Sequence, residues 1–238
     1  MSPQSLRAIG PRLDAAGGML SIWYGRPGGP AGFARLDDTA HYAASTIKLP
    51  LLVAAHRMAD AATLDLDSTV RVHDDFASTS GGRFRLDRGD DNDDEPWERL
   101  GSLAPLRWLA RRMIVRSSNL ATNLLLEVVG LPVVAEALSA CGAVASALRR
   151  PIGDQAGAAG GSSNVVSARD LAAVLGALAL GRAAAPAACA EMLAVLADQE
   201  YLDGIPAVLP PGTRSASKGG WVDGIRHDAA LIWPADTP

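Results

Sequence analysis

Apolar residues recur at helical spacing through the middle of this chain and alternate with polar residues near its two ends. The helical pattern predicts helices over residues 6–16, 103–115, 120–129, 132–140, 167–180 and 187–197. The alternating pattern predicts strands over residues 18–24, 32–35, 214–218 and 228–233. Strands at both ends of a helical middle predict an α/β fold, and 238 residues suffice for one globular unit with a large core.

Residues that start and stop helices support these boundaries. Glycines that end apolar helical runs stand at Gly130, Gly142 and Gly181. Ser167 and Asp170 have the spacing of a capping box at the start of a helix.

Composition and charge exclude several classes of protein. Charged residues make up 20% of the chain and hydrophobic residues 48%, which is typical of a globular protein. The net charge of -4 argues against a nucleic-acid partner, and no apolar run is long enough to predict a membrane span. Residues 1–7 show no basic segment followed by an apolar core, so we expect no secretory signal and a cytoplasmic location.

Neither the cysteines nor the acidic residues predict a metal site or a disulfide. Cys141 and Cys189 lie in alanine-rich helical pattern without C-x-x-C spacing, which favours buried free thiols. Residues 87–95 are rich in aspartate but lack EF-hand spacing, so we interpret them as a solvated acidic loop. His73 precedes two aspartates, but no second histidine follows at ligand spacing, which favours a surface turn. We therefore predict no metal and no cofactor.

Ser45 and Lys48 are the residues most suggestive of chemistry. Their spacing places hydroxyl and amine on one face of the first turn of an apolar helix that includes Leu49, Leu51 and Leu52. A serine becomes a nucleophile when a base lies within hydrogen-bond reach, and a lysine can be that base when burial and nearby cations lower its pKa. Alternatively, the serine could simply cap the helix, and the lysine could bury its hydrocarbon chain while its amine reaches solvent.

Two later segments complete this pair in the order of a known catalytic set. Ser117-Ser118-Asn119 and Lys218-Gly219-Gly220 follow Ser45 and Lys48, as S-D-N and K-T-G follow S-x-x-K. The chain therefore resembles the class A β-lactamase-type serine hydrolases of the β-lactamase and penicillin-binding-protein superfamily. Residues 113–126, 164–171 and 218–221 are similar to the family's segments around these motifs, and the likeness covers most of the chain.

The resemblance implies a role for each motif residue. Ser45 would be the nucleophile that forms an acyl-enzyme, and Lys48 its proton acceptor. Ser117 would relay a proton to the leaving group, with Lys218 supplying positive charge. Asn119 would bind the amide side chain of the substrate.

The resemblance also implies binding positions on the strand that carries the third motif. Gly219, Gly220 and Trp221 would line the substrate, and the backbone N–H groups of Ser45 and Trp221 would form the oxyanion hole.

Departures from the family pattern bear on the reaction. Relatives place a water-activating glutamate four residues before the position of Asn164, where this chain has Gly160. Asp154 is the nearest carboxylate, and its register is wrong for that role. Slow deacylation is therefore expected.

A second departure concerns the binding of a substrate carboxylate. Position 219 is glycine where relatives have serine or threonine, so we expect Ser217, Arg226 or His227 to compensate.

The fold implied by the resemblance is an antiparallel sheet flanked by helices plus an all-helical lobe. The sheet lobe would comprise about residues 1–45 and 205–238, and the helical lobe about residues 46–204. The family's last strand and C-terminal helix would be missing after residue 238. Either the chain is shortened or a partner supplies the strand, and the incomplete sheet could then support self-association.

Three functions fit this pattern. The first is a serine hydrolase that cleaves a small-molecule amide, ester or β-lactam. The second is a catalytically weak or silent protein of the same fold that binds a ligand. The third is a biosynthetic acyltransferase or cyclase.

Overall fold

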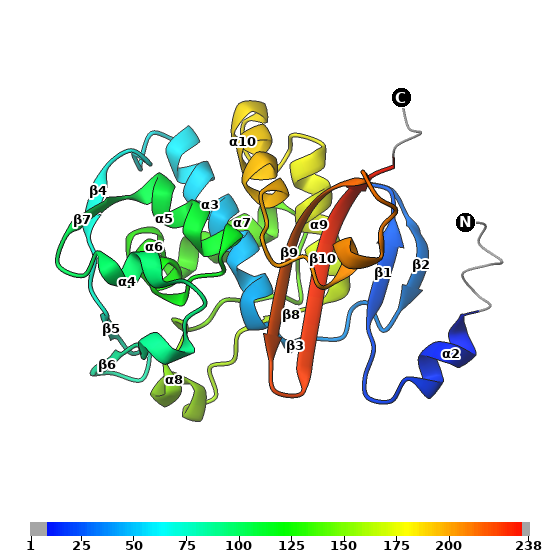
Figure 1. The fold of residues 1–238 in the computed structure, drawn as a ribbon, viewed down its shortest axis with the longest axis horizontal. Coiled ribbons are helices and arrows are strands. Elements are labelled where there is room, and N and C mark those ends of the chain that lie inside the picture. The colour runs from blue at the N-terminus through cyan, green and yellow to red at the C-terminus, as the bar shows by residue number, and fades with distance from the viewer. Residues whose placement is uncertain (1–8, 235–238) are drawn as a thin grey trace.

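The computed structural model describes residues 9–234, which form an α/β fold of helices and small antiparallel sheets (Figure 1). Its helices are α2 (Gly10–Ala15), α3 (Lys48–Asp60), α4 (Asp94–Glu98), α5 (Leu106–Val115), α6 (Asn119–Val129), α7 (Leu131–Ala140), α8 (Gln155–Ala159), α9 (Ala168–Ala179) and α10 (Pro186–Ala197). Three short 3-10 turns are η1 (Ala44–Ile47), η2 (Arg88–Asp90) and η3 (Ile205–Val208).

The strands pair two by two, and every pair is antiparallel. They are β1 (Ile22–Gly25) with β2 (Ala31–Arg35), β3 (His41–Tyr42) with β8 (Val165–Val166), β4 (Thr69–Arg71) with β7 (Leu103–Pro105), β5 (Asp75–Ala77) with β6 (Arg83–Arg85), and β9 (Arg214–Val222) with β10 (Ile225–Trp233). Figure 1 shows β9 and β10 beside β1 and β2, with the helices α3 to α7 gathered on the other side.

The β9–β10 hairpin is the longest strand pair in the described part of the chain. Its register runs without a break from Arg214 opposite Trp233 to Val222 opposite Ile225. The connecting Asp223-Gly224 is a strong signal for a tight hairpin turn, and Gly224 has a φ of 76°. The turn therefore lets both strands extend beyond the predicted bounds of 214–218 and 228–233.

Helix α9 packs against both strand hairpins. It contacts β10 and β1, which belong to separate two-stranded sheets within residues 9–234. One helix thus supports both hairpins.

Helix α3 is the centre of the helical side of the molecule. Every residue from Lys48 to His56 is buried, and the helix contacts α5, α6, α7 and α10. An apolar helix of this kind is stable only when other elements surround it. Its first residue, Lys48, is therefore buried as well.

Several predicted boundaries hold and others shift. Helices α6, α7, α9 and α10 lie within one residue of their predictions, and the predicted strand 32–35 matches β2. The predicted strand 18–24 is shorter and begins at Ile22. The first predicted helix is described from Gly10 to Ala15, and residues 6–8 lie outside the described residues.

The predicted helix over residues 103–115 is wrong at its start. Residues Leu103–Pro105 form β7, and the helix begins at Leu106. Pro105 disfavours helical backbone at the residue before it, so the chain stays extended and pairs with β4.

The predicted capping box is half correct. The Ser167 hydroxyl accepts a hydrogen bond from the backbone N–H of Asp170 at 3.2 Å. The Asp170 carboxylate instead accepts from the backbone N–H groups of Val144, Ala145 and Ser146. Cys141 and Cys189 are buried and free, as predicted.

Within residues 9–234, no single helix has both the length and the apolar character needed to cross a membrane. Only α6 and α7 taken together meet that test, and they are bent by 89° with respect to each other.

Candidate active site

Ser45 lies in a short turn that leads directly into the buried helix α3. Turn η1 ends at Ile47, and the backbone N–H of Lys48 donates to the carbonyl of Ser45. Ala44, just before the serine, has a φ of 44°, in the left-handed region that non-glycine residues rarely adopt. The local chain thus places the half-buried Ser45 three residues before a buried amine, whose own hydrogen bonds go to Ser117 and Asn119.

The Lys48 amine is held by the segment between α5 and α6. Its Nζ donates to the carbonyl of Ser117 at 2.6 Å, to the Ser117 hydroxyl at 3.2 Å and to Asn119 Oδ1 at 2.8 Å. Ser117 is fully buried and has a φ of 57°. This unusual backbone aims both oxygens of Ser117 at the lysine, and such strain often occurs at functional sites.

A second lysine approaches the same hydroxyl from strand β9. Lys218 Nζ donates to Ser117 Oγ at 3.1 Å and to the carbonyl of Gly219 at 2.7 Å. The Ser117 hydroxyl therefore lies between two buried amines. Residues from all three sequence motifs meet at this point.

Burial disfavours the charged forms of both lysines, and repulsion by Lys218 adds to the effect at Lys48. Burial lowers the pKa of Lys48 well below its ordinary value, the positive Lys218 lowers it further, and Asp91 opposes the shift. Burial lowers the pKa of Lys218 from 10.5 to about 7, against a smaller opposing effect of Asp228. Both shifts increase the fraction of neutral amine, the form that can accept a proton.

Strand β9 and turn η1 contact each other through backbone atoms. A Cβ atom built on Gly220 would lie 2.6 Å from the backbone nitrogen of Ser45 and 2.8 Å from that of Thr46. Glycine is required at a contact this close. Trp221, the second predicted oxyanion donor, follows at once, and its ring packs edge-on against Tyr201 with centroids 5.2 Å apart.

The two predicted carboxylate-binding cations lie on different faces of the hairpin. His227 is the register partner of Gly220, whereas Arg226 is the partner of Trp221, and adjacent residues of a strand point to opposite faces. His227 Nε2 is 2.8 Å from the carbonyl of Tyr42, and its ring lies 5.9 Å from that of His41. Arg226 is exposed and pairs with Asp203, so the geometry favours His227.

The remaining predicted residues of β9 lie next to Lys218. Gly219 has room for a side chain, since a Cβ atom there would make only ordinary contacts with the His227 carbonyl and Asp228. Ser217 is buried, and its carbonyl accepts from Gln199.

Asp91 is a residue of this site that the sequence interpretation missed. Its carboxylate accepts from the backbone N–H groups of Asn119 at 2.9 Å and Leu120 at 2.8 Å, and from Trp97 Nε1 at 2.9 Å. Ser118 Oγ donates to the same carboxylate at 3.3 Å. Asp91 thus satisfies free donors at the start of α6 and holds the segment that contacts Lys48.

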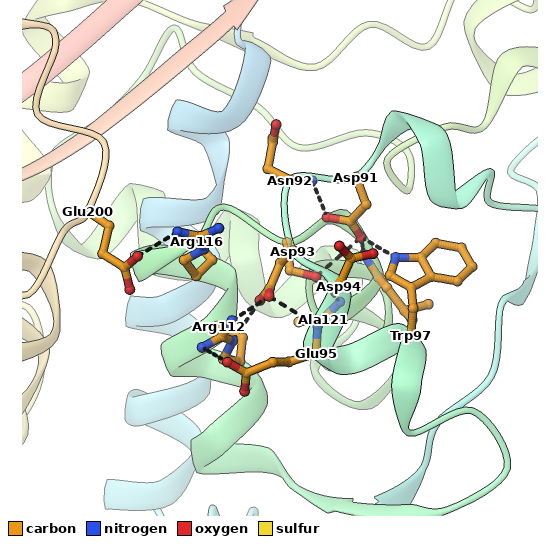
Figure 2. A network of polar contacts seen from close by, with 12 residues as sticks. Asp91, Asn92, Asp93, Asp94, Glu95, Trp97, Arg112, Arg116, Ala121 and Glu200 are labelled. Atoms are coloured by element: carbon orange, nitrogen blue, oxygen red, sulfur yellow. Dashed lines mark hydrogen bonds and ion pairs between the residues drawn. The ribbon is translucent and has the colours of Figure 1, made fainter.

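The prediction of a solvated acidic loop over residues 87–95 is therefore wrong for two of its aspartates. Figure 2 shows Asp91 directed toward Trp97, and Asp93 directed toward Arg112. Asp93 is 4% exposed and accepts from Arg112 Nε at 2.6 Å. The first N–H groups of a helix have no acceptor within the helix. A predicted helix start after Ser118 was therefore a signal that a nearby carboxylate would accept from them.

Asn119 is engaged on both ends of its side-chain amide. Oδ1 accepts from Lys48, and Nδ2 donates to the carbonyl of Asp90 at 2.8 Å. Nδ2 carries a second N–H, so a substrate can accept a hydrogen bond from this amide while the contact with Asp90 remains.

The loop between α7 and β8 is braced by two asparagines. Asn123 exchanges two hydrogen bonds with the backbone of Ile152. Asn164 Oδ1 accepts from the backbone N–H groups of Arg149 and Arg150, and its Nδ2 donates to the Arg150 carbonyl. The loop that carries Gly160 is therefore held at both ends.

Asp154 acts as a brace of this loop. Its carboxylate accepts from Ser78 Oγ, from the backbone N–H and hydroxyl of Thr79, and from the Gly157 N–H that it caps at the start of α8. Burial raises the pKa of Asp154, but these hydrogen bonds outweigh it and lower the pKa overall. A fully buried carboxylate with all these partners is a poor candidate for activating water.

Within residues 9–234, no group of three or more histidine, cysteine, aspartate or glutamate side chains is placed to hold a metal ion. His73 instead pairs with Glu127 at 2.9 Å.

Solved structures resemble this fold over most of its length. A β-lactamase from Sphaerobacter thermophilus has a TM-score of 0.80 and 29% identity, with 96% of this chain and 82% of that chain covered. An ancestral class A β-lactamase has a TM-score of 0.80 and 24% identity, with 100% of this chain and 87% of that chain covered. A variant of PBP-A, solved as an acyl-enzyme complex with penicillin G, has a TM-score of 0.72 and 21% identity, with 86% of this chain and 72% of that chain covered.

These matches confirm the expected β-lactamase-like α/β fold. No curated protein sequence matches the chain. The pattern of the family described as the beta-lactamase enzyme family matches residues 4–238. With its motifs assembled around Ser117 and this match across nearly all of its length, the chain belongs to the beta-lactamase enzyme family.

Proposed function

We propose that this protein is a serine hydrolase that forms an acyl-enzyme on Ser45. The observation that carries the proposal is the position of Ser117 Oγ, 3.2 Å from Lys48 Nζ and 3.1 Å from Lys218 Nζ. Two buried amines with lowered pKa values around one hydroxyl form a proton path without any histidine. Structural packing alone has no need of such an arrangement, because each buried amine costs free energy.

The acylation step follows from this geometry. The neutral amine of Lys48 takes the proton as Ser45 Oγ attacks the carbonyl carbon of an amide, ester or β-lactam. The bond to the leaving group breaks as Ser117 passes it a proton, with Lys48 and Lys218 restoring the hydroxyl. The negative oxygen forms at the start of α3, where backbone N–H groups favour it.

The second half of the cycle is expected to be slow. By sequence register Gly160 stands where relatives carry a water-activating glutamate. The nearby Asp154 carboxylate already accepts hydrogen bonds from Ser78, Thr79 and Gly157. The PBP-A variant solved as an acyl-enzyme complex with penicillin G is a precedent for such an adduct on this fold. We therefore propose a β-lactam as an acylating substrate whose ester persists on Ser45.

The test is covalent labelling followed by mass spectrometry. Wild-type protein is exposed to penicillin G and, separately, to a small fluorophosphonate, and the modified peptide is identified. We expect one adduct per chain on Ser45, no adduct for Ser45→Ala, and wild-type labelling for the exposed control Ser102→Ala. A Ser45→Ala protein that still labels contradicts the assignment of the nucleophile.

Complete absence of an adduct with both probes would favour the second candidate, a silent binder of the same fold. Gly160 and Gly219 are the observations in its favour, because they stand where relatives have the water-activating glutamate and a hydroxyl that binds the substrate carboxylate.

A further inference from the structure

A cavity of about 450 Å³ lies between helices α3, α5 and α10, away from the residues of the candidate active site. Its apolar wall is made by Leu52, Pro105, Trp108, Ala110 and Val195. Its polar residues are His56, Asp67, Arg107, Arg111 and Glu191. This volume falls within the range of small-molecule sites, and an apolar wall with a few polar groups is their usual composition.

His56 is the polar group on the buried side of this cavity. Its side chain is 3% exposed, and Nδ1 lies 3.0 Å from the carbonyl of Leu52. A carbonyl oxygen can only accept, so Nδ1 carries the hydrogen, and Nε2 of the neutral ring presents a lone pair. In the described part of the chain Nε2 has no hydrogen-bond partner. A buried acceptor without a partner is destabilising, which points to a missing donor.

The group that faces His56 is also an acceptor. Glu191 Oε1 lies 3.8 Å from His56 Nε2, too far for a direct hydrogen bond. Glu191 Oε1 already accepts from Arg107, and one donor group placed beside both atoms would satisfy the lone pair of His56 and add a second contact to this carboxylate. An ammonium group has three donors, no acceptor and a positive charge, so it matches this pair.

The other charges argue against an anionic ligand. Arg107 is already paired with Asp67 and Glu191, and Arg111 is paired with Asp198. Neither guanidinium is left to bind a carboxylate or phosphate. The apolar wall in turn suits a hydrocarbon body attached to the ammonium group.

We propose that this cavity is a second, non-catalytic binding site for a small primary amine with an apolar body, its ammonium group lying between His56 Nε2 and Glu191 Oε1. His56 follows Lys48 by eight residues on α3, about 12 Å along the helix axis. The site is therefore separate from Ser45 but built on the helix that carries the lysine base.

The test uses benzylamine with two probes of nearly the same shape, benzyl alcohol and benzoate. Binding is followed through the imidazole NMR signals of the four histidines, each assigned by substitution. We expect millimolar benzylamine to shift the His56 signals in a saturable way, benzyl alcohol to bind several-fold more weakly, and benzoate to leave them unchanged. His41 and His227 report any binding near Ser45, and His73 serves as a remote reference.

Two variants separate the proposed contacts from effects on folding. His56→Leu and Glu191→Gln should each weaken benzylamine binding by about tenfold or more, whereas the control His73→Leu should not. Unperturbed His56 signals at saturating benzylamine would mean that the cavity holds only water, which overturns the proposal. Equal binding of benzoate, or full binding by both cavity variants, would overturn it as well.

Discussion

Gly220 lies so close to Ser45 that a Cβ atom on it would come within 2.6 Å of the Ser45 backbone nitrogen. Strand β9 and turn η1 therefore meet through their backbones. The strand with the second lysine and the turn with the serine keep their relative position through this contact.

Gly220→Ala should disable Ser45 without unfolding the protein. The added methyl group must push β9 away from η1, and a displacement of this kind costs about 10²-fold in rate when it disturbs reacting groups. Gly32→Ala, on β2 and outside the candidate active site, is the matched control, because its Cβ atom would lie 3.6 Å from the nearest atom, an ordinary contact. Fluorophosphonate labelling rates and melting temperatures check both variants. A Gly220→Ala protein that labels at the wild-type rate would show that the close contact between β9 and η1 has no part in acylation.

The rate of acylation should rise with pH, with an apparent pKa well below that of free lysine. Burial and Lys218 lower the pKa of Lys48, and only its neutral form can accept the Ser45 proton. Labelling by a neutral fluorophosphonate from pH 5 to 10 measures this rise, and a flat profile would mean that another group is the base. Penicillin G, an anion, should lose rate again above about pH 7, as Lys218 loses its charge.

The free energy of unfolding should rise with pH between about 7 and 10.5. The pKa of Lys218 is about 7 in the folded chain, whereas its ordinary value is 10.5, so the unfolded chain binds more protons in this window. The destabilisation is fully present below pH 7 and disappears as the pH passes 10.5, the pKa of Lys218 in the unfolded chain. Urea unfolding at several pH values should show an effect on the order of a few kcal/mol. Lys218→Met should flatten the curve, and an unchanged slope would contradict the low pKa.

Asp91→Asn should weaken both the fold and the acylation step. The carboxylate accepts hydrogen bonds from two N–H groups at the start of α6, and losing this charged acceptor costs about 1–3 kcal/mol. Asp91 also raises the pKa of Lys48, so its removal should move the pH–rate profile of labelling to lower pH. The exposed Asp94, which pairs with Arg88, provides the control Asp94→Asn. A variant that is destabilised but keeps the wild-type pH profile would limit Asp91 to a structural role.

Deacylation should be much slower than acylation. Removing a general base typically costs about 10²–10⁴-fold in rate, and Gly160 supplies none. Penicillin G should therefore give a stoichiometric burst followed by slow turnover, with the adduct visible by mass spectrometry. Asp154→Asn should lower stability but leave the lifetime of the adduct unchanged, because Asp154 is already bound by Ser78, Thr79 and Gly157. Rapid multiple turnover by the wild-type protein would show that another residue positions the water.

The parts of this protein that were predictable from sequence are those that depend on near neighbours in the chain. Helices α6, α7, α9 and α10 follow from apolar spacing and from local caps such as Ser167. Ser45 and Lys48 are three residues apart, so their proximity needs only one turn of helix. The three motifs were recognisable because each is a short run of residues.

The tertiary structure alone decided how those motifs combine. Ser117 and Lys48 are separated by 69 residues, and Ser117 and Lys218 by 101, so their contacts depend on how α3, α5 and β9 pack. The same packing brings the half-buried Asp91 to the start of α6, where local composition predicted solvent, and pairs residues 103–105 with β4. Local sequence determines which backbone conformations are favourable. Burial determines which charged groups are desolvated, and burial depends on how the whole fold packs.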